Sequence, residues 1–251
     1  MSRAALAATL TTEDGIRLAA RWWDAERPSG AVVVLVPGFT GSKDDPKTRA
    51  VARALLARGH HVLAYDARGH HGSDGLCTLG DLERLDVAAA VAAARERTDR
   101  VVTVGASMGA IAVLRYAAAS PDLAGVVSVS SPALWRFPRN VRTVLAVLLT
   151  RTELGRRIAA RRMHVRVSPR WRDPAPPRAL AAMIRAPLAV VHGREDRFVP
   201  PSEAVLLATA APNGRLFLVP GMGHAFDPAA IPAIAEAVDW ALSASAPSAE
   251  D

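Results

Sequence analysis

Short apolar runs alternate with longer, alanine-rich segments along most of the chain. The runs are four to seven residues long and rich in valine, as expected for strands that are covered on both faces. They lie at residues 31–36, 62–65, 101–104, 123–129 and 188–192. Segments of helix-forming composition separate them, at 46–58, 79–97, 110–119 and 202–210. This alternation predicts βαβ units, and therefore an α/β fold with a mostly parallel sheet and helices on both faces.

The two ends of the chain extend this pattern. Residues 4–23 indicate two strands around a turn, because Asp14-Gly15 is a hairpin signal and apolar and polar residues alternate over 16–22. Such alternation is typical of a half-buried edge strand. Near the other end, a strand is predicted at 216–219 and a closing helix at 228–242.

The regular pattern is interrupted between residues 132 and 187. Residues 134–162 have the spacing of one or two amphipathic helices, and the proline-rich stretch 173–177 is expected to be extended. We interpret residues 131–187 as a helical lid inserted over the carboxyl edge of the sheet. Residues 1–130 and 188–251 then form one α/β core, as the length of the chain favours.

The composition excludes several classes of protein. No uninterrupted apolar stretch has the length that crosses a bilayer, so we expect no membrane span. The first residues lack the apolar segment of a secretory signal. A single cysteine, Cys77, leaves no internal disulfide and gives no sign of an oxidising compartment. A cytoplasmic protein is therefore expected.

Positive charge is concentrated in the interrupted segment. The net charge of the chain is +7, and residues 131–178 alone hold 12 arginines against two acidic residues, Glu153 and Asp173. One interpretation is an arginine-rich surface that is simply solvated. The alternative is a surface that attracts an anionic substrate, an acidic carrier protein or a membrane. A nucleic-acid partner is not expected, because no recognised binding motif accompanies the charge.

The candidate chemistry starts at Gly105-Ala106-Ser107-Met108-Gly109. This Gly-x-Ser-x-Gly stretch lies between a predicted strand and a predicted helix, which is the setting of a nucleophile elbow. At such a turn the serine adopts a strained backbone conformation, and its crowded neighbours need glycine because any side chain would clash. Ser107 is therefore the candidate nucleophile.

Two further reactive side chains also follow predicted strands. Asp196 comes after the run at 188–192 and His224 after the strand at 216–219. Ligands of open α/β sheets bind beyond the carboxyl ends of the strands, so these side chains are expected to meet Ser107 there. A serine hydroxyl needs a neutral imidazole to accept its proton, and the imidazole needs a buried carboxylate to fix its tautomer. The three residues are thus a candidate catalytic triad.

A hydrolase of this kind also needs backbone N–H donors for the negatively charged oxygen that develops on the substrate. Met108, directly after the serine, is one candidate. The second is expected in the loop after the run at 31–36, where Phe39 is our first choice and Thr40 the alternative.

These motifs resemble those of α/β-hydrolase-fold serine hydrolases, and they are most similar to the branch of small-lid esterases, monoacylglycerol-lipase-like and serine-aminopeptidase-like enzymes. The order Ser, Asp, His matches that fold. The matching stretches are 105–109, 66–73, 192–200 and Gly223-His224, which together span nearly the whole chain apart from the lid. The spacing within 192–200 favours Asp196 over its neighbour Glu195 as the acid.

The chain departs from the family pattern at two positions. Pro37-Gly38 stands where family members usually carry His-Gly, which affects the choice of oxyanion donor. The loop Arg68-Gly69-His70-His71-Gly72-Ser73 has its second glycine displaced by one position, and this is expected to change the packing of the loop more than the chemistry.

Other reactive or aromatic residues have simpler interpretations. His60, His61, His70 and His71 lack accompanying acidic or cysteine ligands at a recognisable spacing, so we expect no metal site. Cys77 is interpreted as a small buried residue and not as a nucleophile. Trp135, Phe137 and Trp171 flank the lid and are expected to pack within it, with substrate contact as an additional role.

The resemblance implies a cofactor-free serine hydrolase that cleaves a carboxylic ester of small or medium acyl chain through an acyl-enzyme, with the lid forming the acyl pocket. A thioesterase acting on acyl-carrier-protein or coenzyme A thioesters is the alternative within the same chemistry, because the lid is basic. A non-catalytic binding protein on a hydrolase scaffold is the alternative outside it. Perhydrolases and cyclases also share the triad, so the fold alone does not name the reaction.

Overall fold

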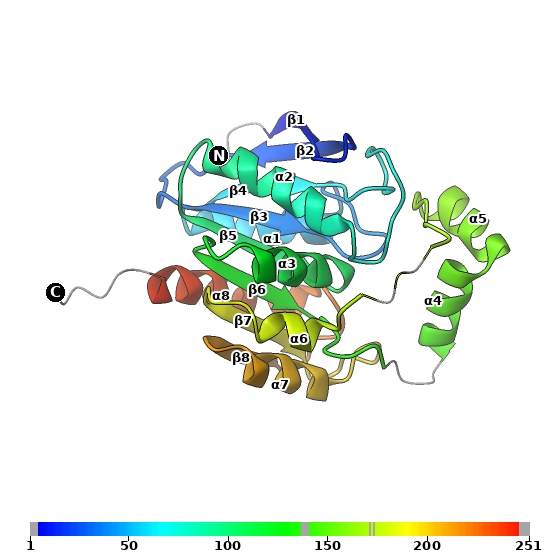
Figure 1. Cartoon of the computed structure of the whole chain (residues 1–251). Coiled ribbons are helices and arrows are strands. Elements are labelled where there is room, and N and C mark those ends of the chain that lie inside the picture. The colour runs from blue at the N-terminus through cyan, green and yellow to red at the C-terminus, as the bar shows by residue number, and fades with distance from the viewer. Residues whose placement is uncertain (1–4, 137–140, 171, 173, 246–251) are drawn as a thin grey trace.

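The valine-rich runs form the inner strands of an eight-stranded sheet in the computed structural model, which describes residues 5–136, 141–170, 172 and 174–245. The strand order is β1-β2-β4-β3-β5-β6-β7-β8. The pairs β1–β2 and β2–β4 are antiparallel and all other neighbours are parallel (Figure 1), which confirms the predicted α/β fold. The strands are β1 (Leu6–Thr11), β2 (Arg17–Trp23), β3 (Val32–Val36), β4 (His61–Tyr65), β5 (Val101–Ala106), β6 (Gly125–Val129), β7 (Leu188–Gly193) and β8 (Gly214–Val219).

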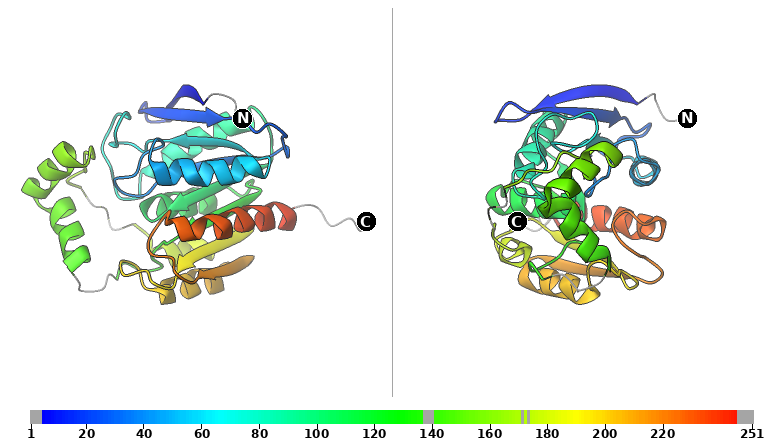
Figure 2. Two further views of the ribbon diagram at one scale, coloured as in Figure 1. Left: turned by 180° about the vertical axis from the view of Figure 1, so that it is seen from behind. Right: turned by 90° about the vertical axis from the view of Figure 1, so that its right-hand side faces the viewer.

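Helices cover both faces of this sheet, which explains why the inner strands are mostly apolar. In β3, Val32, Val34 and Val36 pack into one core layer, whereas Val33 and Leu35 pack into the other. The two layers are seen from opposite sides in Figures 1 and 2. One face carries α2 (Glu83–Arg95), α3 (Met108–Ala119), α6 (Pro177–Ala181) and α7 (Pro201–Ala210), and the other carries α1 (Pro46–Ala57) and α8 (Ile231–Ala244).

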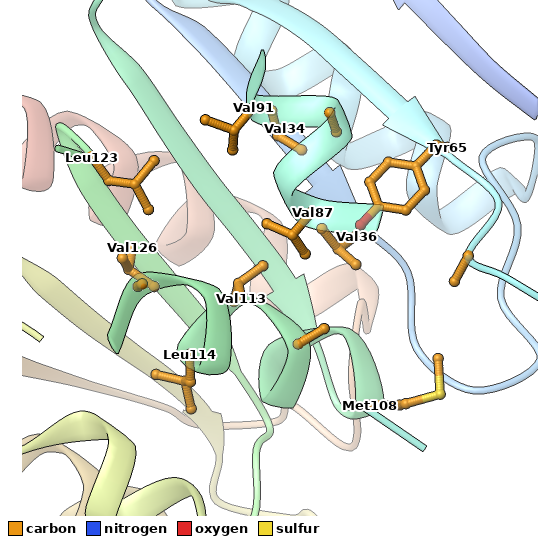
Figure 3. Close-up of a cluster of buried hydrophobic side chains, with 14 of the residues drawn as sticks. Val34, Val36, Tyr65, Val87, Val91, Met108, Val113, Leu114, Leu123 and Val126 are labelled. Atoms are coloured by element: carbon orange, nitrogen blue, oxygen red, sulfur yellow. The ribbon is translucent and has the colours of Figure 1, made fainter. Parts of the chain in front are cut away.

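The layer under α2 and α3 contains most of the large buried side chains. Figure 3 shows Val34 and Val36 of β3 among Val87 and Val91 of α2 and Val113 of α3. These aliphatic side chains are fully buried. Burial of each contributes about 1.5–3 kcal/mol, so this layer holds α3, and with it the turn at its first residue, firmly against the sheet.

One predicted helix boundary is wrong and one helix was not predicted, both for identifiable reasons. Helix α2 begins at Glu83 and not at residue 79, because the Glu83 carboxylate accepts hydrogen bonds from Thr78 and from the Gly80 N–H and so holds 78–82 as a loop. The predicted extended stretch 173–177 leads into α6, which was not predicted. Pro177 occupies the first turn of α6, where proline is tolerated, and Leu180 and Ala181 are buried.

Helices α4 (Val141–Arg151) and α5 (Glu153–Arg162) form a hairpin that lies apart from the layered body, on the right of Figure 1. Thr152 begins α5 as its N-cap and accepts a hydrogen bond from the Gly155 N–H. A Cβ atom on Gly155 would lie 2.0 Å from the Leu148 carbonyl oxygen, so glycine permits the close packing of the two helices. Helix α6 belongs to the predicted lid range but lies on the sheet body beside α3 and α7, and the division at residues 131 and 187 stays a prediction.

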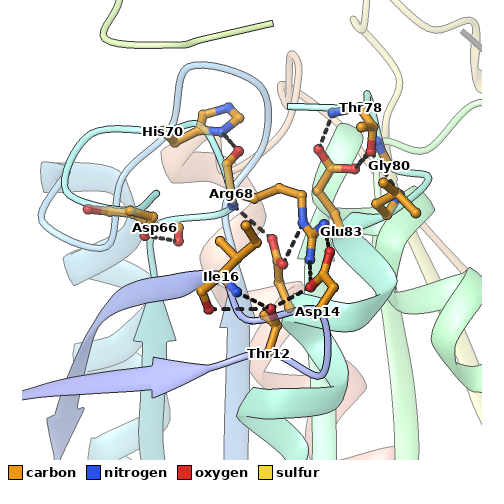
Figure 4. A network of polar contacts seen from close by, with 12 residues as sticks. Thr12, Asp14, Ile16, Asp66, Arg68, His70, Thr78, Gly80 and Glu83 are labelled. Atoms are coloured by element: carbon orange, nitrogen blue, oxygen red, sulfur yellow. Dashed lines mark hydrogen bonds and ion pairs between the residues drawn. The ribbon is translucent and has the colours of Figure 1, made fainter. Parts of the chain in front are cut away.

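A buried ionic network holds the loop after β4. The Arg68 guanidinium donates to Asp86 at 2.8 Å and to Asp14 at 2.7 and 3.0 Å (Figure 4). These contacts join the β1–β2 turn, the loop 66–80 and α2 at the carboxyl end of the sheet. A broken buried pair leaves an uncompensated charge, so the network fixes this loop strongly. No helix among the described residues combines the length and the apolar character needed to cross a bilayer.

Candidate active site

Ser107 lies at a sharp turn between β5 and α3. Its backbone has φ 53° and ψ −112°, a combination that residues with side chains rarely adopt. A Cβ atom on Gly105 would lie 2.3 Å from the Gly109 carbonyl oxygen, and one on Gly109 would lie 2.3 Å from the Val36 carbonyl oxygen. Both flanking glycines are therefore required by close backbone packing, as the sequence motif implies.

The side chains of Ser107, His224 and Asp196 lie in one chain of hydrogen bonds. His224 Nε2 is 2.9 Å from Ser107 Oγ, and His224 Nδ1 is 2.7 Å from Asp196 Oδ2. The three residues follow β5, β8 and β7, so the parallel strands bring together side chains that are far apart in the sequence. The carboxylate accepts a hydrogen bond from the Nδ1–H, which leaves the Nε2 lone pair directed at the serine hydroxyl.

Asp196 is held in its ionised form by its neighbours. Its side chain is fully buried, and its Oδ1 accepts hydrogen bonds from the backbone N–H groups of Phe198 at 2.8 Å and Val199 at 2.9 Å. Burial alone raises the pKa of this carboxyl, but the hydrogen bonds from His224 and from the two amides outweigh it and lower the pKa below its ordinary value. Glu195, the alternative acid, is exposed.

Sequence reasoning gave no role to His192, which lies beneath this carboxylate. Its imidazole is fully buried, donates from Nε2 to the Val199 carbonyl oxygen at 3.0 Å, and has the same nitrogen 3.5 Å from Asp196 Oδ2. Burial lowers the pKa of His192, so the ring is neutral. His192 therefore supports the loop of Asp196 without adding a second charge. In the sequence, the only indication of this role was the position of His192 at the end of the predicted strand 188–192.

A second pair missed by sequence reasoning supports the histidine. The Ser130 Oγ accepts a hydrogen bond from the Ala225 N–H at 3.1 Å, directly beside His224. Ser130 has φ 52° and Ala225 has φ 61°, so both adopt the left-handed region that residues with side chains seldom occupy. Such strain persists only where surrounding contacts determine the conformation, and here it fixes the loop that carries the imidazole.

The N–H of Met108 is well placed to bind a negatively charged oxygen, whereas that of Ser107 is not. The Ser107 N–H donates to the Val129 carbonyl oxygen at 2.8 Å and is therefore already engaged. Met108 is the first residue of α3, and an N–H at this position has no acceptor within its own helix. The positive end of the helix dipole lies at the same point and favours a developing negative charge.

The loop after β3 lies directly against the serine turn. A Cβ atom on Gly38 would lie 3.0 Å from the Ala106 carbonyl oxygen and 3.3 Å from Ser107 Cβ. The next residues are Phe39 and Thr40, our two candidates for the second donor. Phe39 lines the same cavity as Ser107, and the choice between the two N–H groups stays a prediction.

Two contacts hold this loop in place. The Asp66 carboxylate accepts hydrogen bonds from the hydroxyl of Ser42 and from the backbone N–H and the ammonium group of Lys43. The His71 ring donates from Nε2 to the Thr40 carbonyl oxygen at 3.2 Å. His71 itself has φ 40°, at the position where the related motif carries glycine.

A cavity of about 410 Å³ opens beside the serine, within the range of small-molecule sites. Its walls are mostly apolar and include Leu79, Ile111 and Trp135. One face of α4 closes the far side with Thr143, Ala146, Val147 and Thr150. The cavity therefore fits an apolar group whose reactive end meets Ser107.

The remaining candidate residues lie elsewhere or have structural contacts. His60 and His61 lie at the start of β4 and contact Asp239 and Asp24, respectively, and His70 is buried. Within the described ranges, no group of three or more His, Cys, Asp or Glu side chains is arranged to hold a metal ion. Burial raises the pKa of the Cys77 thiol, which is fully buried with Sγ 3.5 Å from Met108 Sδ.

Of the three aromatic residues expected to flank the lid, Trp135 lines the cavity and donates from Nε1 to the Pro174 carbonyl oxygen at 2.7 Å. Phe137 and Trp171 lie outside the described residues.

Several curated proteins resemble the chain at the level of sequence. A monoacylglycerol lipase of Mycolicibacterium smegmatis is 28% identical, and the match covers 84% of this chain and 86% of the relative. An uncharacterized protein of Mycobacterium tuberculosis is 30% identical over 85% of this chain and 70% of the relative. A non-heme chloroperoxidase of Streptomyces lividans is 36% identical over 112 residues, which are 44% of this chain and 38% of that protein.

A solved structure and a family model agree with these matches. An esterase of Pyrococcus furiosus superposes with a TM-score of 0.71 at 23% identity, covering 96% of this chain and 89% of the esterase. Residues 31–154 match the model of the α/β hydrolase fold family. With its eight-stranded sheet and its serine elbow between β5 and α3, the chain belongs to the α/β hydrolase fold family.

Proposed function

We propose that the chain is a serine hydrolase that cleaves a carboxylic ester of small or medium acyl chain through an acyl-enzyme. The observation that carries this proposal is the unbroken series of hydrogen bonds from Asp196 through His224 to Ser107, at the mouth of an apolar cavity. The relatives support an ester substrate, because they include a monoacylglycerol lipase and an esterase.

In the first half of the reaction, Ser107 Oγ attacks the carbonyl carbon of the ester while His224 Nε2 accepts the hydroxyl proton. The carbonyl oxygen becomes negatively charged, and the N–H groups of Met108 and Phe39 stabilise it. When the tetrahedral intermediate collapses, the bond to the alcohol breaks and the alcohol leaves with the proton from His224. Asp196 stabilises the imidazolium throughout without taking its proton.

In the second half, water attacks the acyl-serine while His224 accepts one of its protons. The carboxylic acid leaves and the proton returns to Ser107 Oγ, so the enzyme is regenerated. The apolar cavity holds the acyl group in both halves. No cofactor takes part in any of these steps.

A fluorophosphonate probe tests the proposal, because it reacts only with an activated serine. We expect the wild-type chain to be labelled and Ser107→Ala to be unlabelled, with kcat for p-nitrophenyl butyrate lowered roughly a millionfold. A wild-type chain that is folded yet unlabelled, beside a known serine hydrolase that labels, would instead favour a non-catalytic binding protein on this scaffold.

A thioesterase acting on an acidic carrier protein or on coenzyme A thioesters is the second candidate, favoured by the arginines of the segment 131–178. The two functions differ in their dependence on salt, since salt screens attraction between exposed charges. Loss of acyl-carrier hydrolysis between 0.05 and 0.5 M NaCl, with aryl-ester cleavage retained, favours the thioesterase. Aryl-ester cleavage with no carrier hydrolysis at either concentration favours the esterase.

A further inference from the structure

Helix α4 is apolar on two different faces. One face, which includes Ala146 and Val147, closes the cavity beside Ser107. Another face consists of Val141, Val144, Leu145 and Leu148, which the spacing of three and four residues places in one row along the helix. We call this row the α4 stripe. A helix that only covered a cavity would need one apolar face, so the α4 stripe requires a separate explanation.

The α4 stripe lies in solvent. Its four side chains are 48 to 76% exposed. Leu154 and Ile158 of the adjoining α5 are also exposed, at 69 and 42%, and their i, i+4 spacing places them on one face of α5. Val147, at the edge of the cavity face, is 52% exposed as well. Single exposed aliphatic side chains are ordinary, but seven on one hairpin form a surface of the kind that marks an interaction site.

The same hairpin is strongly basic. Arg157, Arg161 and Arg162 of α5 are exposed next to Leu154 and Ile158 along the helix. Among the described residues of 131–178, Glu153 is the only acidic side chain, and it pairs with Arg157 at 2.6 Å. Exposed aliphatic side chains accompanied by arginines are the composition of helices that lie at an anionic lipid surface.

Charge argues against the other occupants of this surface. Two copies of the hairpin would bring like charges together across a dimer interface, which costs free energy. An acidic protein would satisfy the arginines but would leave the α4 stripe unexplained, because attraction between charges needs no aliphatic contact. An anionic lipid surface satisfies both features, since headgroups bind the arginines and acyl chains receive the aliphatic side chains.

We propose that the α4–α5 hairpin docks on an anionic lipid surface, with the α4 stripe, Leu154 and Ile158 inserted at the level of the acyl chains and the arginines of α5 at the headgroups. The hairpin stands apart from the sheet body in the left view of Figure 2, so it can reach a flat surface first. Because α4 also borders the cavity, docking places the cavity next to the lipid. This inference concerns binding and does not depend on the proposed hydrolysis.

Sedimentation with lipid vesicles tests the inference. The full chain carrying Ser107→Ala is mixed with vesicles of phosphatidylcholine containing 30% phosphatidylglycerol, and with vesicles of phosphatidylcholine alone. We expect binding to the anionic vesicles at 0.05 M NaCl, at least tenfold weaker binding to the neutral ones, and release as the salt is raised to 0.5 M. Turnover has no part in this measurement, so failure of the proposed function does not affect it.

Substitutions with matched controls locate the contact. Leu145→Glu in the α4 stripe should weaken vesicle binding at least tenfold, whereas Val205→Glu, on α7 and similarly exposed at 45%, should leave it unchanged. Arg161→Gln with Arg162→Gln should weaken binding about 30-fold, because each basic residue near an anionic surface contributes about fivefold. Arg84→Gln with Arg185→Gln, exposed on the sheet body, is the matched control.

Circular dichroism of each variant establishes that it is folded before binding is compared. The inference is overturned if the folded chain does not bind anionic vesicles, or if Leu145→Glu binds them as well as Val205→Glu. It is also overturned if sedimentation velocity shows a dimer that Leu145→Glu abolishes, or if the hairpin binds an acidic carrier protein and no vesicle.

Discussion

Replacement of Asp196 by asparagine changes the charge of the triad acid but almost none of its shape. The asparagine Oδ1 can keep the two hydrogen bonds from the Phe198 and Val199 amides. Its Nδ2 then faces His224 Nδ1, where the carboxylate oxygen lies at 2.7 Å in the native chain. Two N–H donors would oppose each other there, so the imidazole must adopt the other tautomer, with its proton on Nε2 and directed at Ser107.

An imidazole in that tautomer is unable to accept the serine proton. The expected result is a fall in kcat of about ten-thousandfold, which corresponds to about 5.4 kcal/mol of lost transition-state stabilisation. KM should change little, because Asp196 lies behind His224 and does not line the cavity. Glu195→Gln removes the same charge from the adjacent, exposed residue, and it should keep kcat within about twofold.

Initial rates with p-nitrophenyl butyrate, normalised to the concentration of folded protein, provide the assay. Circular dichroism and thermal unfolding establish that each variant is folded. The reasoning is refuted if Asp196→Asn keeps more than about a tenth of the native kcat. It is refuted equally if Glu195→Gln is the variant that loses activity, since the acid would then be the wrong residue.

Four further predictions follow from the same geometry. Gly109→Ala should lower the free energy of unfolding by about 3 kcal/mol in urea titrations, because its Cβ would lie 2.3 Å from the Val36 carbonyl oxygen; an unchanged midpoint would contradict this. His71→Gly should lower kcat several-fold, because it removes the hydrogen bond to the Thr40 carbonyl oxygen. Stability should not fall, because glycine adopts a φ of 40° without strain. A native kcat would show that the hydrogen bond from His71 to Thr40 is not needed for activity. Folding lowers the pKa of Asp196, so the stability that its ionised carboxylate contributes is present above pH about 4 and is lost as the pH falls through the folded pKa. The difference in unfolding free energy between wild type and Asp196→Asn should therefore shrink below pH about 4. A difference that stays constant with pH would argue against an ionised Asp196. Ala146→Phe should narrow the cavity and lower kcat/KM for octanoyl esters at least tenfold relative to acetyl esters, and equal losses for both would place the acyl group elsewhere.

The sheet and its layers could be predicted because their signal is local. Each inner strand is a continuous apolar run, and such runs form only where both faces are covered. Asp196 and His224 could be proposed because strand ends in an α/β sheet meet at one edge. The start of α2 and the whole of α6 could not be predicted in this way. The first depends on the Glu83 side chain, and the second on burial of Leu180 and Ala181 against the core.

The supporting residues of the site depend on contacts between distant segments. Ser130 holds the Ala225 amide, 95 residues further along the chain. His71 reaches the Thr40 carbonyl from a different loop, and His192 lies under a carboxylate whose burial is known only from the fold. Composition and spacing contain no information on such pairs, since the local sequence around a serine or histidine does not show which distant residue it contacts.

The α4–α5 hairpin leaves the sheet body at a place in the chain that is separate from the three candidate triad residues. The hairpin follows β6, whereas Ser107, Asp196 and His224 follow β5, β7 and β8. A donor hairpin from another hydrolase could therefore be grafted after Ser131 without cutting a loop that carries a reactive side chain. Under the proposed function, exchange of this hairpin is expected to change the acyl preference and to leave the candidate triad unaltered.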